Sequence, residues 1–420
     1  MTRKMKDSGI EWIGEIPESW SVVKLKYCAE FVQQKYDAQY EPVDYIGLEN
    51  IVSWNGKYIE TESICDKTQS IVFQENDILW GKLRPYLAKV YHCPHNGCCS
   101  SEFCVIRVNI EQNIRYYWFM LISSGFIETV NRSTYGTKMP RANADYIKSA
   151  FVPVPPISEQ ARIASYLDTQ CAKIDAVLEQ TRQSIEEYKR LKQAVITRAV
   201  TKGIRPGRKM KDSGIEWIGE VPEEWEVRRI KTLFSLRDER NYLPLEEVNL
   251  ISLYTDKGVV QHSDLEKTTG NKASNADGYK LVYENDIVVN IILCWMGAIG
   301  RSAYNGVTSP AYDIYIPSDE VDCRFYHHYF RTSGFSGDCY KRGKGIMAMR
   351  WRTYSDQFRD IRVVMPPIEE QREILAYLDM KTAEIEKLIV KKEGFIIELE
   401  SYKKSLIYEC VTGKREVTQE

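Results

Sequence analysis

The sequence predicts an α+β protein in which two similar α/β modules are separated by two long antiparallel coiled-coil-like helices, with a pseudo-twofold internal repeat. Two observations predict this fold class: a long internal repeat, and a seven-residue apolar pattern at the end of each copy. The thirteen residues RKMKDSGIEWIGE stand at 3–15 and again, unchanged, at 208–220. A repeat of this length indicates the tandem duplication of one folding unit, in too few copies for a solenoid.

The repeat continues through each unit with a slowly growing offset. Glu75–Ile78 recurs as Glu284–Ile287 at an offset of 209, and Pro155–Ile157 recurs as Pro366–Ile368 at an offset of 211. The ends of the two units are near-identical in sequence, whereas their interiors match only at scattered positions. We therefore expect the ends to form a common scaffold and the interiors to serve different purposes.

The stretches 158–200 and 369–411 predict long helices. Both are free of proline and follow a Pro-Pro pair that cannot lie inside a helix. Apolar residues recur in the same phase in both, which favours pairing of the two helices over an amphipathic helix lying on its own module. Because the chain leaves along the first helix and returns along the second, the pair must be antiparallel. The predicted helix-pair core is Ile174, Val177, Ile185, Tyr188, Leu191, Val195, Ile385, Leu388, Ile396, Leu399, Tyr402 and Leu406.

Each module, about 21–155 and 226–366, carries a segment that joins glycine, cationic side chains and an aromatic ring. The segments occupy matched positions, 132–143 and 341–352. Arg and Asn side chains can hydrogen-bond to base edges and Lys suits phosphates, so both segments are candidates for DNA contact. A solvated surface loop is the plainer alternative. The candidates are Tyr135, Lys138, Arg141 and Asn143 in the first module, and Lys341, Arg342, Lys344, Arg350, Trp351 and Arg352 in the second.

A second candidate surface lies at Lys82–Tyr86, where Lys82, Arg84 and Tyr86 are the candidate contacts. The matching residues of the second module, Ile291–Met296, are apolar. This divergence fits two readers of different sequences, and it fits ordinary variation of a core equally well. From about 172 to 200 the first helix would span about 43 Å. That length is enough to hold two modules roughly one turn of B-DNA apart.

The composition is that of a soluble globular chain of two to three domains, with 420 residues, 28% charged and 43% hydrophobic. There is no run of 18 apolar residues and no apolar leader, so we expect neither a membrane span nor a signal peptide. Eleven cysteines at irregular spacing indicate a reducing cytoplasm. The net charge of −2 argues against a globally basic nucleic-acid binder and leaves room for local basic loops.

Motifs for catalysis are missing. The sequence has no Asn-Pro-Pro-aromatic motif of amino-methyltransferases, no Gly-x-Gly cofactor loop after a strand, and no Walker loop. A His/Cys cluster at 92–104 has spacing within the range of zinc ligands. However, the adjacent Cys98 and Cys99 suit one metal poorly, and the second module has no counterpart. We therefore expect no catalytic residue and no metal site, with these cysteines as free thiols.

Together these motifs resemble the specificity subunit of a type I restriction–modification system, over nearly the whole chain. The resemblance is carried by DSGIEWIGEIP at 7–17 and its second copy, by KLRPYL at 82–87 with SSEF at 100–103, and by PPISEQARIA at 155–164, which recurs at 366–375. It implies two target recognition domains set between helical scaffold segments. The implied division is a scaffold repeat at 1–20, a first target recognition domain at 21–155, a central conserved helix at 156–203, a linker and second scaffold repeat at 204–225, a second target recognition domain at 226–366, a C-terminal conserved helix at 367–413, and a tail at 414–420.

The resemblance implies a function without catalysis. Such a subunit reads a bipartite, asymmetric site on double-stranded DNA and targets associated methyltransferase and restriction subunits to it, in a prokaryotic cytoplasm. Its partners would be two modification (methyltransferase) subunits and, in the full complex, two restriction (motor and nuclease) subunits. S-adenosylmethionine, ATP and Mg²⁺ are expected in those partners and no cofactor in this chain. The alternatives are a stand-alone DNA methyltransferase or nuclease, and a coiled-coil adaptor that binds no DNA.

Overall fold

The computed structural model describes residues 3–36, 44–61, 70–136, 138–262, 275–345 and 351–418. The chain divides into two units. Unit 1 comprises Met1–Arg182 with Glu393–Glu420, and unit 2 comprises Gln183–Lys392. Each unit therefore holds one module, one copy of the scaffold repeat and a part of each long helix. Among the described residues, no helical segment combines the length and apolar character that a bilayer crossing requires.

The centre of the module in unit 1 is an antiparallel four-stranded sheet in the order β4-β10-β7-β8. Its middle strand β10 is almost fully buried, which fits its run of β-branched and aromatic residues. The sheet strands are β4 (Ala29–Val32), β10 (Phe103–Val108), β7 (Ile78–Gly81) and β8 (Val90–His92). The other strands are β1 (Met5–Asp7), β2 (Glu15–Pro17), β3 (Ser21–Lys24), β5 (Tyr45–Ile46), β6 (Ile71–Phe73), β9 (Gly97–Cys99) and β11 (Phe151–Val154).

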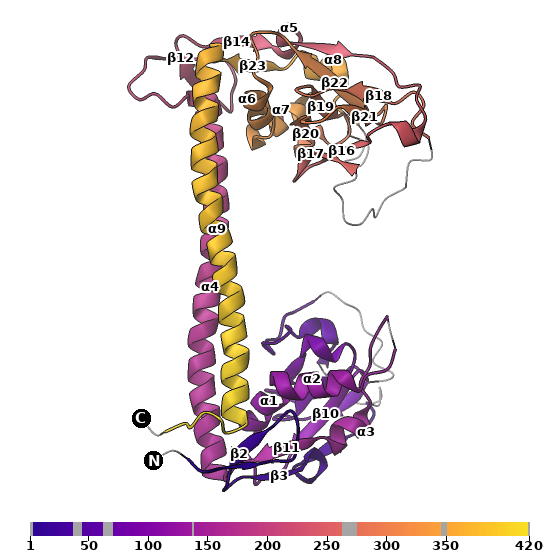
Figure 1. Ribbon diagram of the computed structural model, residues 1–420, viewed down its shortest axis with the longest axis vertical. Helices are drawn as coiled ribbons and strands as arrows, with labels where there is room; N and C mark the ends of the chain where they lie inside the picture. The colour runs from indigo at the N-terminus through magenta and orange to yellow at the C-terminus, as the bar shows by residue number, and fades with distance from the viewer. Residues whose placement is uncertain are drawn as a thin grey trace. The chain divides into compact units, whose positions relative to one another are not determined.

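Helix α1 (Ile114–Ile122) joins this sheet to the long helices, and every residue from Tyr116 to Ile122 is buried. The Trp118 indole donates to Val90 O on β8 at 3.1 Å, while the Tyr116 hydroxyl donates to Val411 O on the C-terminal long helix at 3.0 Å. Figure 1 shows α1 beside the C-terminal end of that helix, which is drawn in yellow. A helix that is apolar all round is expected between two packed layers. The described residues of unit 1 also form the short helices α2 (Ser124–Arg132), α3 (Ala144–Ser149), η1 (Leu25–Tyr27), η2 (Leu48–Asn50) and η4 (Pro85–Leu87).

Unit 2 repeats the topology, with an antiparallel sheet in the order β15-β22-β19-β20. The sheet strands are β15 (Phe234–Arg237), β22 (Tyr312–Pro317), β19 (Ile287–Asn290) and β20 (Ile299–Arg301). The other strands are β12 (Met210–Asp212), β13 (Glu220–Pro222), β14 (Glu226–Arg229), β16 (Ile251–Tyr254), β17 (Gly258–Gln261), β18 (Lys280–Val282), β21 (Gly306–Thr308) and β23 (Arg362–Met365). Besides the long helices, the part of unit 2 that the structure describes contains α5 (Ile230–Leu233), α6 (Cys323–Phe330), α7 (Ser333–Arg342), α8 (Ser355–Arg359), η5 (Leu245–Glu247) and η7 (Cys294–Met296). The predicted fold class, two similar α/β modules and two long helices, is confirmed.

The turn before β7 and before β19 explains why Glu-Asn-Asp-Ile recurs. Asn76 and Asn285 adopt φ values of 70° and 71°, a left-handed conformation that Asn tolerates. The following carboxylates, Asp77 and Asp286, are buried and each accepts a backbone N–H of its own turn at 2.8 Å. Each carboxylate also binds an arginine, but Arg107 comes from β10 and Arg237 from β15. The two modules therefore keep the same turn with different partners.

The long helices are α4 (Ile157–Lys202) and α9 (Ile368–Val411), each starting directly after its Pro-Pro pair. In unit 1, Lys403 binds Asp175 at 2.7 Å and Arg182 binds Glu400 at 2.7 Å. Residue numbers rise on one helix as they fall on the other, so these segments are antiparallel, as predicted. In unit 2, Lys192 binds Glu386 at 2.5 Å.

Burial corrects the predicted helix-pair core by one residue at four positions. Of the predicted core, Ile174, Ile185, Ile385 and Leu406 are buried, and Tyr188, Val195, Ile396 and Leu399 are partly buried. Val177, Leu191, Leu388 and Tyr402 are exposed, so their assignment was wrong. Their places are taken by the next residues, Leu178, Lys192, Ile389 and Lys403, which are buried or partly buried. We call the line of buried and partly buried residues between the two helices the seam. At these four points its successive residues are four apart in sequence, whereas the prediction placed them three apart.

Candidate nucleic-acid interface

In unit 1 the two predicted contact segments lie side by side. Leu83 and Arg141 form an antiparallel bridge. On either side of it Arg84 N donates to Pro140 O at 2.7 Å, and Ala142 N donates to Lys82 O at 2.9 Å. The sequence presented these segments as separate candidates, whereas the structure makes them one surface, which we call loop pair 1: Lys82–Tyr86 with Tyr135–Asn143, except Thr137, which lies outside the described residues.

The side chains of loop pair 1 differ in how free they are to contact a ligand. Tyr86, Tyr135 and Lys138 are exposed. Arg141 binds Glu102 at 2.8 Å, and the Asn143 carboxamide oxygen caps α3 by accepting Asp145 N at 2.8 Å. The cap is a structural task that the sequence analysis did not assign to Asn143. Lys82 and Arg84 are half-buried.

In unit 2 the equivalent segments meet in the same way. Thr353 N donates to Ile291 O at 2.9 Å, and the backbones of Lys344 and Arg352 exchange hydrogen bonds of 2.8 and 3.0 Å. We call this surface loop pair 2: Ile291–Met296 with Lys344, Gly345 and Trp351–Thr353. Candidate residue Arg350 lies outside the described residues.

Two predicted cations of unit 2 flank loop pair 2 and have acidic neighbours. Lys341 binds Glu216 of the scaffold repeat at 2.7 Å, and this pairing raises the pKa of the Lys341 ammonium. Arg342 lies 3.7 Å from the Asp360 carboxylate. Both pairs are exposed to solvent, so neither prevents the side chain from exchanging its acid for a phosphate.

A stack of three aromatic rings supports loop pair 2. Tyr340 stacks on Trp351 with ring centroids 4.9 Å apart, and it contacts Trp295 with centroids 5.6 Å apart and the ring planes tilted by 58°. The first module has Tyr86 and Asn131 in the places of Trp295 and Tyr340, at an offset of 209, and Pro140 in the place of Trp351, at an offset of 211, so it has no such stack. Of these three residues, only Trp351 is a contact that the sequence predicts. Trp295 and Tyr340 were missed because their contact with Trp351 depends on three segments that meet only in the folded chain.

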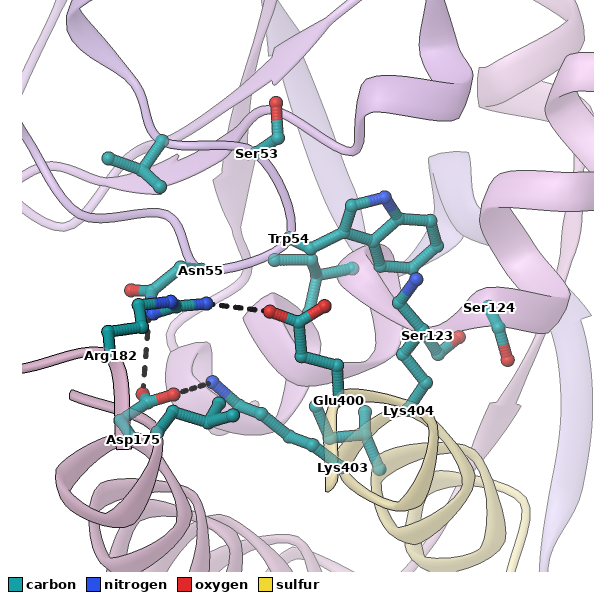
Figure 2. Close-up of a pocket in the computed structure, with 14 residues that line it drawn as sticks. Ser53, Trp54, Asn55, Ser123, Ser124, Asp175, Arg182, Glu400, Lys403 and Lys404 are labelled. Atoms are coloured by element: carbon teal, nitrogen blue, oxygen red, sulfur yellow. Dashed lines mark hydrogen bonds and ion pairs between the residues drawn. The ribbon is translucent and has the colours of Figure 1, made fainter. Parts of the chain in front are cut away.

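In unit 1 the module is fastened to both long helices through the loop 52–56 (Figure 2). Trp54 adopts a φ of 61°, and the Lys404 ammonium of α9 lies 4.0 Å from its ring centroid. The Asn55 amide donates to Asp175 of α4 at 3.4 Å, and Asp175 also accepts from Lys403. These groups line a pocket of about 190 Å³. The contacts fix the orientation of the module on the helix pair, because they involve both helices at once.

A second fastening recurs in both units. Arg115 on α1 binds Asp168 of α4 at 2.6 Å, and Arg324 on α6 binds Asp379 of α9 at 2.6 Å. The Arg115 guanidinium also stacks 4.0 Å from the Trp118 ring centroid. The two arginines stand at an offset of 209 and the two aspartates at 211, so this ion pair belongs to the duplicated frame.

The scaffold repeat packs on the first turn of the long helix in its own unit. Glu159 accepts from the Trp20 indole at 2.9 Å and binds Arg3 at 2.6 Å. Glu370 accepts from the Trp225 indole at 3.0 Å and binds Arg208. The residues that pack are therefore repeated for structural reasons.

Several exposed residues of the repeat have local roles that recur in both copies. Asp7 and Asp212 accept the N–H groups of Gly9 and Gly214, whose φ values are positive. Glu11 and Glu216 bind Arg132 and Lys341. Six identical residues of the repeat are exposed to solvent in both copies: Lys4, Lys6, Asp7, Gly9, Glu11 and Glu15, with Lys209, Lys211, Asp212, Gly214, Glu216 and Glu220. Lys4 and Glu15, with Lys209 and Glu220, are exposed positions at which core packing does not require identity.

The cysteines between 92 and 104 lie in the core of the first module. Cys93, Cys98 and Cys99 are fully buried, and burial raises the pKa of the Cys93 and Cys99 thiols far above its usual value. Burial also raises the pKa of Cys104 to about 11. In the part of the chain that is described, no group of three or more His, Cys, Asp or Glu residues is placed to hold a metal ion. These cysteines therefore act as small apolar side chains.

The fold and the loop pairs define a class of protein: a duplicated α/β module, each copy with one loop surface, mounted on a pair of long helices. Residues 17–187 and 222–393 each match the family model of the type I restriction modification DNA specificity domain. The two matches cover most of the chain, and the chain belongs to this family. The predicted resemblance is confirmed.

Relatives support the assignment. The chain is 24% identical to the EcoDI type I restriction enzyme specificity subunit of Escherichia coli over 188 residues, which are 44% of this chain and 42% of that protein. It is 23% identical to the MjaVIII specificity subunit of Methanocaldococcus jannaschii over 245 residues, 54% of this chain and 52% of that one. The matches thus span about half the length of these two relatives. A third match, to the EcoBI specificity subunit of Escherichia coli, is 20% identical and covers 98% of this chain and 90% of that protein.

Solved structures share the fold. A chain from a study of complex assembly and conformational transition of the type I R-M system superposes with a TM-score of 0.72 at 16% identity, over 95% of this chain and 99% of that chain. The HsdS subunit from Thermoanaerobacter tengcongensis superposes with a TM-score of 0.53 at 18% identity, over 95% and 98% of the two chains.

Proposed function

We propose that this chain is a non-catalytic specificity subunit that reads a split, asymmetric DNA site and brings modification and restriction subunits to it. The observation that carries the proposal is the pair of loop surfaces. Equivalent segments meet in both modules, yet they present different side chains, as expected if each module reads a different half of one site. Membership of the DNA specificity domain family supports the assignment.

The duplicated scaffold supports two identical partners. Its six exposed repeated positions provide one docking surface in each unit, which suits two copies of a modification subunit. We further propose two restriction subunits in the full complex. S-adenosylmethionine, ATP and Mg²⁺ would be bound by those partners, and base flipping for methylation would occur in the modification subunits.

The long helices suit a spacing role. An α-helix rises about 1.5 Å per residue, and α4 continues without a break from one unit into the other. We propose that the helix pair sets the length of a gap in the DNA site that neither module reads.

Methylation mapping of the assembled complex tests the proposal. Incubation of the complex with S-adenosylmethionine and genomic DNA should methylate adenines in one bipartite motif, and the lone chain should methylate nothing. Methylation by the lone chain would instead make it an enzyme, and methylation without a motif would contradict sequence reading.

A matched pair of lysines tests the interface. Lys138→Ala removes an exposed cation of loop pair 1, so it should weaken binding by a similar factor across sequences and reduce the slope of log affinity against log salt by about 1. The control Lys173→Ala removes an exposed lysine on α4 and should leave both quantities unchanged. Equal effects of the two substitutions would place loop pair 1 away from DNA.

A further inference from the structure

We infer that module two recognises thymine methyl groups in its half of the site, through the exposed apolar side chains Leu293 and Met296. This inference rests on the proposed function and names the chemistry that one module reads. We call these two residues the apolar knob. Leu293 is 36% exposed and Met296 is 52% exposed, although both stand in a short loop where polar side chains are the norm.

The backbone holds the knob in one conformation. The Asn290 side chain accepts the N–H groups of Ile292 and Leu293 at 2.9 and 3.3 Å, and Met296 N donates to Leu293 O at 2.9 Å. Residues 293 and 296 therefore project from the same side of the single turn of η7, since side chains three apart eclipse in a 3₁₀ helix. Gly297 ends the turn with a φ of 86°.

A half-buried arginine fastens the turn from behind. The Arg331 guanidinium donates to Gly297 O at 3.3 Å and Ile299 O at 3.2 Å, and to Thr255 O and Asp256 O at 2.9 Å each. Four carbonyl acceptors hold this side chain between the knob turn and the β16–β17 turn. The first module has Ile122 at the matching position, so the fastening belongs to module two.

The aromatic stack and the cations around the knob fit DNA as the occupant. Trp295, between the two knob residues, packs on Tyr340, and Trp351 stacks on the same ring. The same surface carries the cationic side chains of Lys344 and Arg352, next to Lys341 and Arg342. Apolar and cationic side chains on one loop surface match the major groove, where phosphates border the base edges.

Thymine is the base that an apolar side chain can select. Its C5 methyl group is the only apolar group on the base edges of the major groove, and apolar contact with it is a standard means of recognition. At the position of Leu293 the first module carries Arg84, and next to it Lys82; both offer donors to guanine instead. At the position of Met296 it keeps an apolar residue, Leu87. The two halves of the site should therefore differ in chemistry.

Deoxyuridine substitution tests the inference on the assembled complex. After the site has been mapped by methylation, each thymine is replaced in turn by deoxyuridine, which lacks only the methyl group, and binding of the duplex is measured. At one or more positions in one half-site the affinity should fall about fourfold, the loss expected when one methyl group is no longer buried.

Substitution of the knob links the effect to named residues. Met296→Gln and, separately, Leu293→Gln should abolish the difference between thymine and deoxyuridine at those positions, whereas Met296→Leu should keep it. The control Leu243→Gln changes a 53% exposed leucine outside the loop pair and should also keep it. Combining each protein substitution with the thymine-to-deoxyuridine substitution forms a double-mutant cycle, which separates loss of this one contact from a general loss of affinity.

Two results would overturn the inference while leaving the proposed function intact. One is specific binding in which deoxyuridine costs nothing at any thymine. The other is a deoxyuridine cost that both knob variants retain in full. Absence of all sequence-specific binding would refute the proposed function, and the inference with it.

Discussion

At the scale of single residues, the scaffold repeat depends on two glycines that the sequence did not single out. A Cβ on Gly125 would lie 2.7 Å from the Trp12 ring, and a Cβ on Gly334 would lie 2.1 Å from the Trp217 ring. Trp12 and Trp217 are the same residue of the thirteen-residue repeat. Each tryptophan therefore packs directly on a helix backbone, which only glycine permits.

Two alanine substitutions in α7 should have opposite effects. Gly334→Ala should destabilise unit 2 by about 1–3 kcal/mol, because the methyl group overlaps the Trp217 ring. Gly337→Ala, in the same helix, places its methyl group where no other atom lies within 4 Å, so it should stabilise the unit by up to about 1 kcal/mol through helix propensity. Urea unfolding measures both. Equal shifts for the two variants would show that Trp217 does not pack on this helix.

Two histidines at the end of α6 should make the protein sensitive to acid. Burial lowers the pKa of His327 to about 3, and the ring accepts Arg301 N at 3.2 Å through Nδ1. Burial lowers the pKa of His328 as well. The unfolded chain takes up protons below about pH 6.5 and the folded chain does not, so stability is retained above pH 6.5 and lost as pH falls toward 3.

The variant His327→Asn isolates one of these protons. Its free energy of unfolding should fall less steeply between pH 6.5 and 5, by up to about 1.4 kcal/mol per pH unit relative to the parent chain. Denaturant titrations at pH 7.5, 6.0 and 5.0 measure the slope. An unchanged slope would mean that His327 takes up its proton in the folded state as easily as in the unfolded chain.

At the scale of elements, the long helices were predictable in extent but not in every contact. The Pro-Pro pairs placed their starts within a residue, because proline cannot continue a helix backward. The seam slipped by one residue at Val177 and Leu388 because each precedes another apolar residue. It slipped at Leu191 and Tyr402 because the true seam residues are lysines, whose carbon stems pack in the seam while their ammonium groups bind acids.

The seam makes a testable distinction within α4. Ile185 is 6% exposed, so Ile185→Asp would bury an unpaired carboxylate and should cost at least about 3 kcal/mol, with aggregation. Leu191 is 48% exposed, and Leu191→Asp should cost less than about 1 kcal/mol. Thermal unfolding with light scattering measures both. A larger effect at Leu191 would restore the seam that the sequence pattern first suggested.

The loop pairs were the least predictable elements. Sequence patterns identified Lys82–Tyr86 and 132–143 separately, but strand pairing over some 55 residues depends on tertiary contacts that local composition does not encode. The Asn143 cap and the Arg141–Glu102 pair were missed for the same reason. The aromatic stack of module two became visible only when three distant segments were placed together.

At the scale of the whole molecule, the duplication was the most informative feature, because it is encoded in the sequence itself and needs no knowledge of pairing. It predicted two similar modules, and both sheets have the same strand order. It also implies that each module is held by the long helices through equivalent contacts, as the Arg115–Asp168 and Arg324–Asp379 ion pairs are.

Lengthening the helix pair should change the DNA site. Four residues inserted in each helix, near Gln183 and near Gly394, add about 6 Å, or one to two base pairs at about 3.4 Å each. Methylation mapping should then find the same two half-sites with a longer gap. An unchanged gap would contradict the spacing role of the helices.

The ion pairs of the long helices have a consequence for how such a protein could arise. Lys192 binds Glu386, and Lys403 binds Asp175; at an offset of 211, Lys403 corresponds to Lys192 and Glu386 to Asp175. Each half thus carries one acid and one base in positions that suit a second copy of itself. A polypeptide ending near residue 204 should sediment as a homodimer and select a palindrome, and a monomer would argue that ancestry through a self-pairing half is wrong.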